Sequence, residues 1–387
     1  MAIYLDYNAT APIRREVIEQ MIHVWKDVPG NPASQHQFGR AARKRLEEAR
    51  ERILTLLGAE PTREGDRLIF TSGGTEANNL AILGIALART EGMPGRIIIS
   101  SIEHPSVLRA AETLVDWGWR LDTLDVHPNG VVNVESLRRW ISPQVALVSV
   151  TTANHETGVI QPIAEIAAIC HSHGVPFHTD AVQAVGKMPV SFRDFNADAM
   201  TVTPHKFGGP LGIGALIIKR GTPLRPILYG GEQQEGLRPG TESVALAVGM
   251  ETALSLAVAE LEDNIAKMTA LRQEFEQTLK TLIPDVVIHG EAAPRLPQTV
   301  NLAIPGIDNQ LLFTALDLEG VCCSIGSACS SGSPEPSPSL LALGVPREIV
   351  KSSLRISFGP KTTAEELHVA AHTIARVSQQ LRKHVLR

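Results

Sequence analysis

Short apolar runs alternate with segments of helical spacing between residues 67 and 218. Apolar runs occupy residues 68–70, 97–99, 145–150, 199–202 and 215–218, and helical spacing is seen at 77–88 and 107–115. Such alternation is typical of a mostly parallel sheet sandwiched between helices. The pattern therefore predicts an α/β fold, in which ligands bind beyond the carboxyl ends of the strands.

The pattern changes on both sides of this region. An extended arm at residues 4–10 is followed by helical spacing at 14–27 and 40–57, and a long helical segment runs from 243 to about 282. Beyond it, strands near 286–288, 298–303, 321–323 and 354–358 and helices at 310–318 and 364–381 indicate a smaller α+β unit. We expect an arm at 1–14 that joins the small domain, a large domain at 15–258 and a small C-terminal domain at 259–387.

Composition narrows the class of protein. The chain has 387 residues, of which 43% are hydrophobic and 20% charged, with a net charge of −5. A net negative charge gives no electrostatic case for nucleic acid or an anionic membrane as the main partner. There is no signal-peptide pattern and no apolar run of the roughly 18 residues that a membrane helix needs, so we expect a cytoplasmic enzyme.

The four cysteines are predicted to be reduced thiols, because the chain is long enough to form a core without disulfides. No CxxC pair occurs, and no metal site is expected. Cys170, Cys322 and Cys323 lie in helix or strand patterns and are expected in the core. Cys329 instead lies among small residues at 326–333, followed by prolines. An exposed thiol on such a loop could reach both a buried cofactor and an external acceptor, as a sulfur carrier must.

Lys206 lies in a loop at 203–214 that is rich in glycine and joins two predicted buried strands. Glycine allows the backbone to approach a planar or phosphorylated ligand closely. A desolvated lysine there loses its charge readily and becomes an amine nucleophile, which can form a Schiff base. Taken alone, this stretch is equally compatible with a solvated lysine in a turn.

Other strand ends carry further candidates. Residues 71–76 follow the strand at 68–70 and lead through a Gly-Gly turn into a helix. The free N–H groups at the start of that helix suit a phosphate. An ordinary threonine N-cap would give the same sequence pattern. His104 could stack on a ring or move protons, but a lone histidine is more often structural. Asp180, if buried, needs a partner, and the protonated pyridine nitrogen of pyridoxal 5'-phosphate (PLP) would supply one.

Six motifs then occur in a fixed order. They are Thr-Ser-Gly-Gly-Thr-Glu-Ala-Asn-Asn at 71–79, Glu-His-Pro-Ser-Val at 103–107, Glu-Thr-Gly at 156–158, Thr-Asp-Ala-Val-Gln at 179–183, His-Lys at 205–206 and Gly-Ser-Ala-Cys-Ser-Ser-Gly at 326–332. Together they resemble the NifS/IscS-type cysteine desulfurases, which are PLP enzymes of fold type I in the class V aminotransferase group. The resemblance extends from Tyr4 to about Gly359.

The resemblance implies a role for each matching residue. Lys206 would hold PLP as a Schiff base, Asp180 would pair with the pyridinium nitrogen, and His104 would stack on the ring and assist proton transfer. Gln183 would donate to the phenolic oxygen of the cofactor. The phosphate would be held by Gly74, Thr75, Thr203 and His205, and by Thr241 of a neighbouring subunit, which requires a homodimer.

Arg355 lies in a predicted strand whose alternation buries Leu354, Ile356 and Phe358 and turns the arginine to the other face. A planar guanidinium suits a carboxylate, and the resemblance implies that Arg355 binds the substrate α-carboxylate. From the strand pattern alone, an arginine on the surface is the simpler explanation.

Three positions depart from the family pattern. His155 stands where the family usually has Asn, near the expected position of the PLP oxygen and the substrate carboxylate. Thr203-Pro204 replaces Ser followed by a small residue, and Tyr7 replaces an Asn in the N-terminal arm. A histidine can still donate, but it is larger and titrates near neutral pH, so His155 bears most directly on the substrate.

The resemblance implies conversion of L-cysteine to L-alanine, with the sulfur carried as a persulfide on Cys329 to an acceptor such as an iron–sulfur scaffold protein. Other fold type I PLP enzymes remain alternatives: a selenocysteine lyase, a cystine lyase or an aminotransferase. An aminotransferase has no need of the Cys329 loop. A non-catalytic assembly subunit would have no reason to keep Lys206, Asp180 and His104 together with Cys329.

Overall fold

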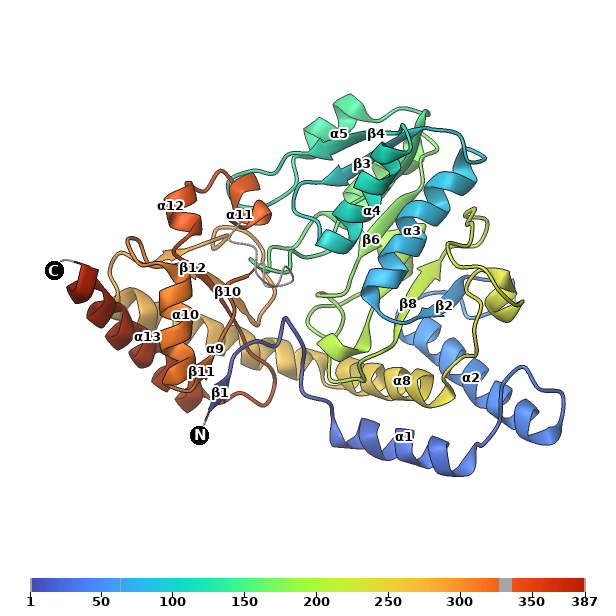
Figure 1. The fold of residues 1–387 in the computed structure, drawn as a ribbon, viewed down its shortest axis with the longest axis horizontal. Helices are drawn as coiled ribbons and strands as arrows, with labels where there is room; N and C mark the ends of the chain where they lie inside the picture. Colours follow the sequence, from blue (N-terminus) through green and yellow to red (C-terminus); the bar gives the residue numbers. More distant parts are fainter. Residues whose placement is uncertain (1, 63, 327–335, 386–387) are drawn as a thin grey trace.

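A computed structural model describes residues 2–62, 64–326 and 336–385. In Figure 1 a large sheet with its helices lies to the right, and a smaller group of helices and strands lies to the left. Both termini lie on the side of the smaller group.

Seven strands of the described chain form the large sheet. They are β2 (Arg67–Thr71), β3 (Arg96–Ser100), β4 (Arg120–Leu124), β5 (Val145–Ser149), β6 (Phe177–Asp180), β7 (Ala199–Val202) and β8 (Gly214–Ile218). Their spatial order is β2-β8-β7-β6-β5-β3-β4, and β8 is antiparallel to both of its neighbours while the other pairs are parallel. The predicted α/β fold with a mostly parallel sheet is confirmed.

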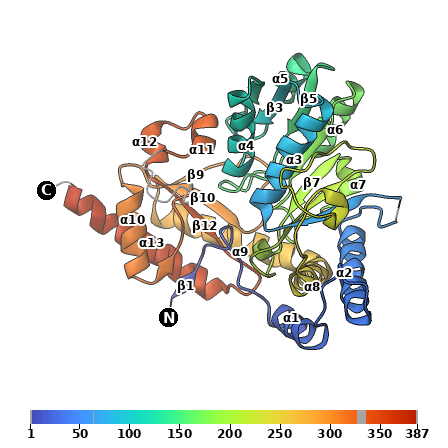
Figure 2. The same ribbon diagram turned by 45° about the vertical axis from the view of Figure 1, so that its right-hand side comes forward.

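Helices cover both faces of this sheet, because successive side chains of a strand point to opposite faces. Ile97 and Ile99 of β3 share a core cluster with α3 (Gly74–Arg89) and α4 (Pro105–Asp116). Ile98 belongs to the cluster on the opposite face. That cluster contains residues of α2 (Gln37–Leu56), α5 (Val134–Trp140), α6 (Ile163–Ser172) and α8 (Val244–Ala259), and Figure 2 shows α3 and α4 in front of the sheet with α2 and α8 below them.

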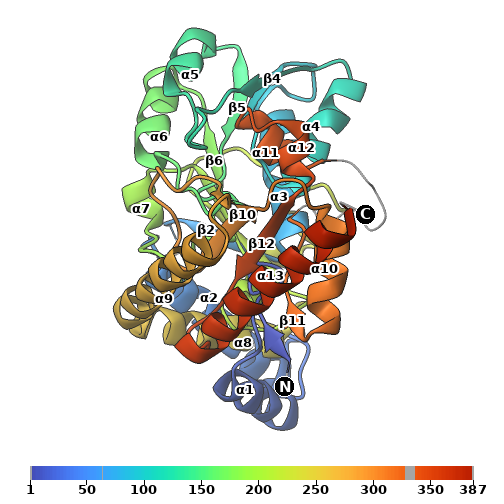
Figure 3. The same cartoon turned by 90° about the vertical axis from the view of Figure 1, so that its left-hand side faces the viewer.

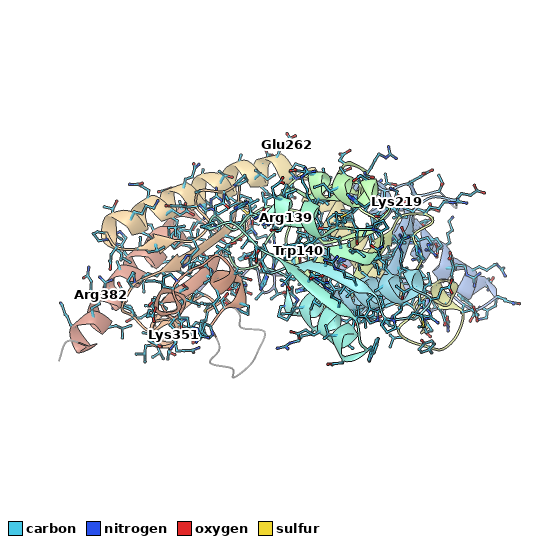
Figure 4. All side chains as sticks on the ribbon, turned by 90° about the horizontal axis from the view of Figure 1, so that it is seen from above. Arg139, Trp140, Lys219, Glu262, Lys351 and Arg382 are labelled. Atoms are coloured by element: carbon cyan, nitrogen blue, oxygen red, sulfur yellow. The ribbon has the colours of Figure 1, made fainter. Side chains whose placement is uncertain are left out.

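The segment predicted as one long helix at 243–282 is two helices, so that prediction was wrong. Helices α8 and α9 (Leu261–Leu282) are bent by 69° at Glu260, whose φ of −100° and ψ of 7° leave the helical region. Each helix is buried in a different core: Leu254 packs in the large domain, while Phe275 packs in the small one. Figure 4 places Glu262, at the start of α9, between Lys219 of the large domain and Arg382 of the small one.

The small domain has a three-stranded antiparallel sheet among its described residues, in the order β12-β10-β9. Its elements are β9 (Val287–Ile288), β10 (Thr299–Ala303), α10 (Asn309–Leu318), β11 (Val321–Cys322), α11 (Pro338–Ala342), α12 (Arg347–Val350), β12 (Ser353–Ser357) and α13 (Ala364–Val385). Figure 3 shows α9, α10 and α13 in front of this sheet, and one buried cluster joins them to it. The remaining short helix of the large domain is α7 (Phe192–Phe195).

The N-terminal arm belongs in space to the small domain. Strand β1 (Ile3–Tyr4) pairs in parallel with β11, and Leu5 is buried in the small-domain core. The chain then passes into the large domain, where α1 (Arg15–Asp27) packs Val17 and Met21 against Ala253 of α8. The division into domains at residues 14 and 258 stays a prediction. Near the second boundary, Leu254 still belongs to the large-domain core and Met268 belongs to the small-domain core.

The described cysteines are free thiols, but they are not all buried. Cys170 and Cys323 lie in the core as expected, whereas Cys322 is partly exposed. The expectation for Cys322 was wrong because side chains alternate along the extended chain here: Val321 and Cys323 are buried, and Cys322 between them, at the end of β11, turns outward.

Among the described helices, none is by itself long and apolar enough to cross a membrane, and only the bent pair of α8 and α9 meets both criteria together.

Candidate active site

Lys206 lies at the carboxyl end of β7, in a 3₁₀ turn (Pro204–Lys206) of the loop that leads to β8. Its Nζ donates to the backbone oxygens of Asn8 at 2.6 Å and Ala9 at 2.8 Å. The predicted position of the lysine, in an irregular loop between two buried strands, is confirmed. Lys206 also lines a cavity of about 140 Å³ that lies between the two domains.

Asp180 is the last residue of β6 and is 5% exposed. Its Oδ2 accepts from Asn78 Nδ2 at 2.7 Å, and its Oδ1 accepts from the backbone N–H of Val182 at 2.9 Å. Both donors are neutral, and two carboxylate oxygens can accept further hydrogen bonds. A buried carboxylate is costly without a cationic partner, so this arrangement fits a protonated pyridine nitrogen.

His104 caps α4, where its Nδ1 accepts from the backbone N–H of Ser106 at 3.1 Å. Asn78 Nδ2 donates to Ser106 Oγ at 2.8 Å, which ties this cap to the Asp180 carboxylate. Burial lowers the pKa of His104, Asp180 opposes that effect, and the charges of Lys206 and Arg355 add to it.

His155 follows β5 and packs its ring edge-on against His104, with 5.3 Å between the ring centres. Burial, followed by the neighbouring groups His104, Arg355 and Lys206, lowers the pKa of His155 well below its usual range. The ring is therefore neutral at pH 7. The replacement of the usual family Asn thus keeps an uncharged group that can donate a hydrogen bond.

Arg355 is in the middle of β12 and is 4% exposed, so it is not a surface arginine. Leu354, Ile356 and Phe358 are buried in the small-domain core, as the alternation predicted. Arg355 Nη2 pairs with Asp6 Oδ1 at 2.8 Å, and Nη1 donates to the His155 carbonyl oxygen at 3.1 Å. Its Nε is buried without a hydrogen-bond partner among the described residues, which leaves a donor available for a further acceptor.

Three of the predicted phosphate residues, Gly74, Thr75 and Thr203, lie close together at the start of α3. Helix α3 begins at Gly74, and the backbone N–H groups of its first turn have no partners within the helix. A Cβ added to Gly74 would lie 3.1 Å from Val182 Cγ2 and 3.7 Å from Thr203 Cγ2, so glycine allows the helix start to pack closely against these side chains. Thr75 occupies the same first turn of the helix. The cradle suits a phosphate group.

His205 and Thr203 both have hydrogen-bond partners. His205 Nδ1 lies 3.3 Å from Thr10 Oγ1. Burial, with Lys206 and Lys187, lowers the pKa of His205 to about 4, so it would meet a phosphate as a neutral donor. Thr203 Oγ1 donates to the backbone oxygen of Ile213 at 3.0 Å.

Gln183 is buried, with Nε2 donating to the Asn8 backbone oxygen at 2.9 Å. Thr241 is exposed and lines a surface hollow with Ser72 and Arg238, and its contact with a second subunit stays a prediction. Cys329 lies outside the described residues. Among those residues, no group of three His, Cys, Asp or Glu side chains could hold a metal ion.

Asn8 was not predicted as a site residue. It is 1% exposed, and its backbone oxygen accepts from both Lys206 and Gln183. Its Nδ2 donates to the backbone oxygen of His155 at 3.3 Å and to Thr299 Oγ1 at 2.9 Å. A polar residue in the extended arm was the available signal, but nothing local distinguishes it from an exposed asparagine.

Comparison with known proteins gives the family. The class V aminotransferase model matches residues 3–369. The cysteine desulfurase IscS of Dictyoglomus turgidum is 42% identical over 381 residues, covering 98% of this chain and 95% of the relative. A solved NifS-like protein is 32% identical, with a TM-score of 0.90 over 98% of this chain and 100% of its own.

A second solved structure, SspA in complex with cysteine, is 32% identical, with a TM-score of 0.79 over 93% of this chain and 99% of its own. Members of the class V aminotransferase family depend on PLP, and the arrangement at Lys206 and Asp180 fits that cofactor. The chain therefore belongs to the class V aminotransferase family and, within it, to the cysteine desulfurases of the IscS and NifS type.

Proposed function

We propose that this chain is a PLP-dependent cysteine desulfurase that converts L-cysteine to L-alanine and carries the sulfur on Cys329. The observation that carries the proposal is that Lys206, Asp180 and His104 all lie at the carboxyl ends of strands in one sheet, while Arg355 of the other domain donates to the backbone oxygen of His155 beside them. The relatives named above, including one solved with cysteine bound, support this choice.

The chemistry of the described residues suits the cofactor. Asp180 would hold the proton on the pyridine nitrogen, His104 would cover the ring, and Gln183 and His155 would donate to the phenolic oxygen. Gly74, Thr75, Thr203 and His205 would hold the phosphate. When bound, PLP withdraws electrons from the substrate Cα, which acidifies the proton there. Lys206 would bind the cofactor and move that proton.

Arg355 would bind the α-carboxylate of the substrate. Its present anionic partner, Asp6, is exposed over 22% of its side chain, and the arginine Nε has no partner among the described residues. A guanidinium can bind a carboxylate through two parallel hydrogen bonds. The substrate would therefore be oriented by a side chain from the small domain while the cofactor residues come from the large one.

The sulfur step can be written as a balanced exchange. The Cys329 thiolate attacks the sulfur of the bound substrate, an S–S bond forms, and the substrate C–S bond breaks. The electron pair of that bond stays with the substrate carbon, which takes up a proton and gives alanine. The sulfur is oxidised and the carbon reduced, so no external oxidant is needed. A thiol acceptor, such as an iron–sulfur scaffold protein, would then take the sulfur from Cys329.

A single turnover tests the function. Purified cofactor-loaded protein mixed with L-cysteine should gain one sulfur atom by intact mass, located on Cys329, and release a matching amount of alanine. The variant Cys329→Ser should gain none. Full sulfide release from Cys329→Ser would contradict the persulfide step. Conversion of the cofactor to its pyridoxamine form without persulfide would instead identify an aminotransferase.

A further inference from the structure

Lys187 is a buried lysine to which the reaction described above gives no role. It follows β6 in the chain and is only 6% exposed. Its Nζ donates to Gln183 Oε1 at 2.9 Å, and the side chain lines the same cavity of about 140 Å³ as Lys206. An amine is costly to bury, so its presence here needs an interaction that an apolar residue could not make.

That interaction is with the amide of Gln183, which lies between two groups of opposite hydrogen-bonding character. Lys187 Nζ donates to the amide oxygen, and the backbone oxygen of Asn8, which can only accept, lies 2.9 Å from Gln183 Nε2. Both contacts favour the same orientation of the amide. A flipped amide would place its oxygen against the Asn8 oxygen, which has no hydrogen to donate, and would turn its N–H groups toward the Lys187 donor, so both observed bonds would be lost.

This orientation leaves one N–H of Gln183 for another acceptor. A primary amide nitrogen has two N–H donors, of which one is directed to Asn8. The Asn8 oxygen also accepts from Lys206 Nζ at 2.6 Å, which brings Gln183 and the reactive lysine to the same carbonyl.

The charged groups around Lys187 are mostly cationic. Burial lowers the pKa of Lys187 well below its usual value, and Lys206 and Arg355 lower it further. Arg14, Lys361 and Glu260 also line the cavity, and both carboxylate oxygens of Glu260 accept from Arg14. The acceptor that the structure gives Lys187 is therefore the amide rather than a carboxylate.

We propose that Lys187 is a positioning residue that holds the Gln183 amide with its N–H group toward the phenolic oxygen of the cofactor. It acts through Gln183 and does not touch the cofactor itself. The inference rests on the proposed function only in that PLP binds at Lys206.

The test measures cofactor binding, separately from turnover. Lys187→Met removes the donor at similar volume, and we expect the dissociation constant for PLP to rise about tenfold, which corresponds to the loss of one hydrogen bond. The visible absorbance band of the loaded protein should also shift. Lys361→Met is the matched control, since this exposed lysine lines the same cavity without a contact to Gln183, and it should bind PLP as the parent does.

A double-variant cycle decides whether the effect passes through the amide. In a Gln183→Ala background, Lys187→Met should cause no further loss of affinity. Parent-like binding and absorbance in Lys187→Met, or an equal loss in both backgrounds, would overturn the inference. If the parent protein itself binds no PLP or makes no alanine, the proposed function fails instead, so the two failures are distinguishable.

If Lys187→Met does not fold, Lys187→Arg and Lys187→Gln provide the comparison. Arginine only donates and should hold the amide, whereas glutamine can also accept and should loosen it. Equal affinity for PLP in these two variants would contradict the positioning role.

Discussion

At the scale of single residues, burial without charge partners sets the ionisation of several histidines. His178 in β6 is fully buried, and desolvation lowers its pKa to about 3. Its ring nitrogens lie 2.9 Å from Ser149 Oγ and 3.0 Å from Thr201 Oγ1, so the neutral ring has partners on both sides. The unfolded chain, with an ordinary histidine pKa, takes up a proton that the folded chain does not.

This difference predicts a loss of stability in acid. A depressed folded-state pKa contributes stability that is present above the unfolded pKa of about 6.5 and is lost as the pH falls. Because of His178, the unfolding free energy should therefore fall by about 2 kcal/mol as the pH is lowered from 6.5 to 5. Denaturant unfolding of the parent and of His178→Gln at both pH values measures this, and the variant should show a smaller pH dependence by that amount.

The comparison with a variant is needed because Glu103 acts in the opposite direction. Burial raises the pKa of Glu103 to about 8, so its contribution is present at low pH and lost as the pH rises. Equal pH dependence in the parent and in His178→Gln would show that the buried ring is protonated in the folded state.

At the scale of elements, the junction of α8 and α9 is held by a salt bridge from the N-terminal segment. Arg14 Nη1 and Nη2 pair with the two carboxylate oxygens of Glu260 at 2.6 and 2.9 Å. Glu260 is the residue at which the two helices meet, and Arg14 immediately precedes α1. The bidentate pair therefore links the start of α1 to the bend between the two domains.

Removing this pair should have a small but measurable effect. Both side chains are partly exposed, so Arg14→Met should lower the unfolding free energy by about 1 kcal/mol or less. Arg15→Met is the control, because Arg15 pairs with Glu19 within one exposed helix and should change nothing measurable. Equal midpoints of thermal unfolding for the two variants would show that the junction does not depend on the pair.

At the scale of the whole molecule, we propose that two copies of the chain form a dimer. The exposed face of α1 carries Ile18, Ile22 and Trp25 at helical spacing, with 41, 40 and 62% of their areas exposed. An apolar stripe of this kind is typical of a surface that another protein covers. Thr241 is exposed as well, as expected for a residue that reaches the phosphate of a partner's cofactor.

Mixing two inactive chains tests the exchange of Thr241. In a mixed dimer of Lys206→Ala and Thr241→Ala chains, the Thr241→Ala chain keeps its lysine and receives an intact threonine from its partner. Refolding the two variants together should restore tight PLP binding to part of the Thr241→Ala chains, measured by retained cofactor after dialysis. Affinity no better than that of Thr241→Ala alone would mean that each threonine serves its own chain.

Features that depend on local pattern could be predicted from the amino-acid sequence. Alternating apolar runs fix the strands, and the chemistry at their ends singled out Lys206, Asp180 and His104, because parallel strands bring such ends to one edge. The alternation of β12 separated Arg355 from its buried neighbours in the same way. The strand ends alone did not identify a ligand. The six motifs taken together indicated PLP.

Tertiary structure alone decided the contacts between residues far apart in the chain. Periodicity cannot show that the Asn8 oxygen meets Lys206 and Gln183, that Arg355 pairs with Asp6, or that Lys187 holds an amide in the core. It also could not separate α8 from α9, since both halves have helical spacing and the bend arises because each packs into a different core. These features follow from how the two domains and the arm pack together, which no local pattern encodes.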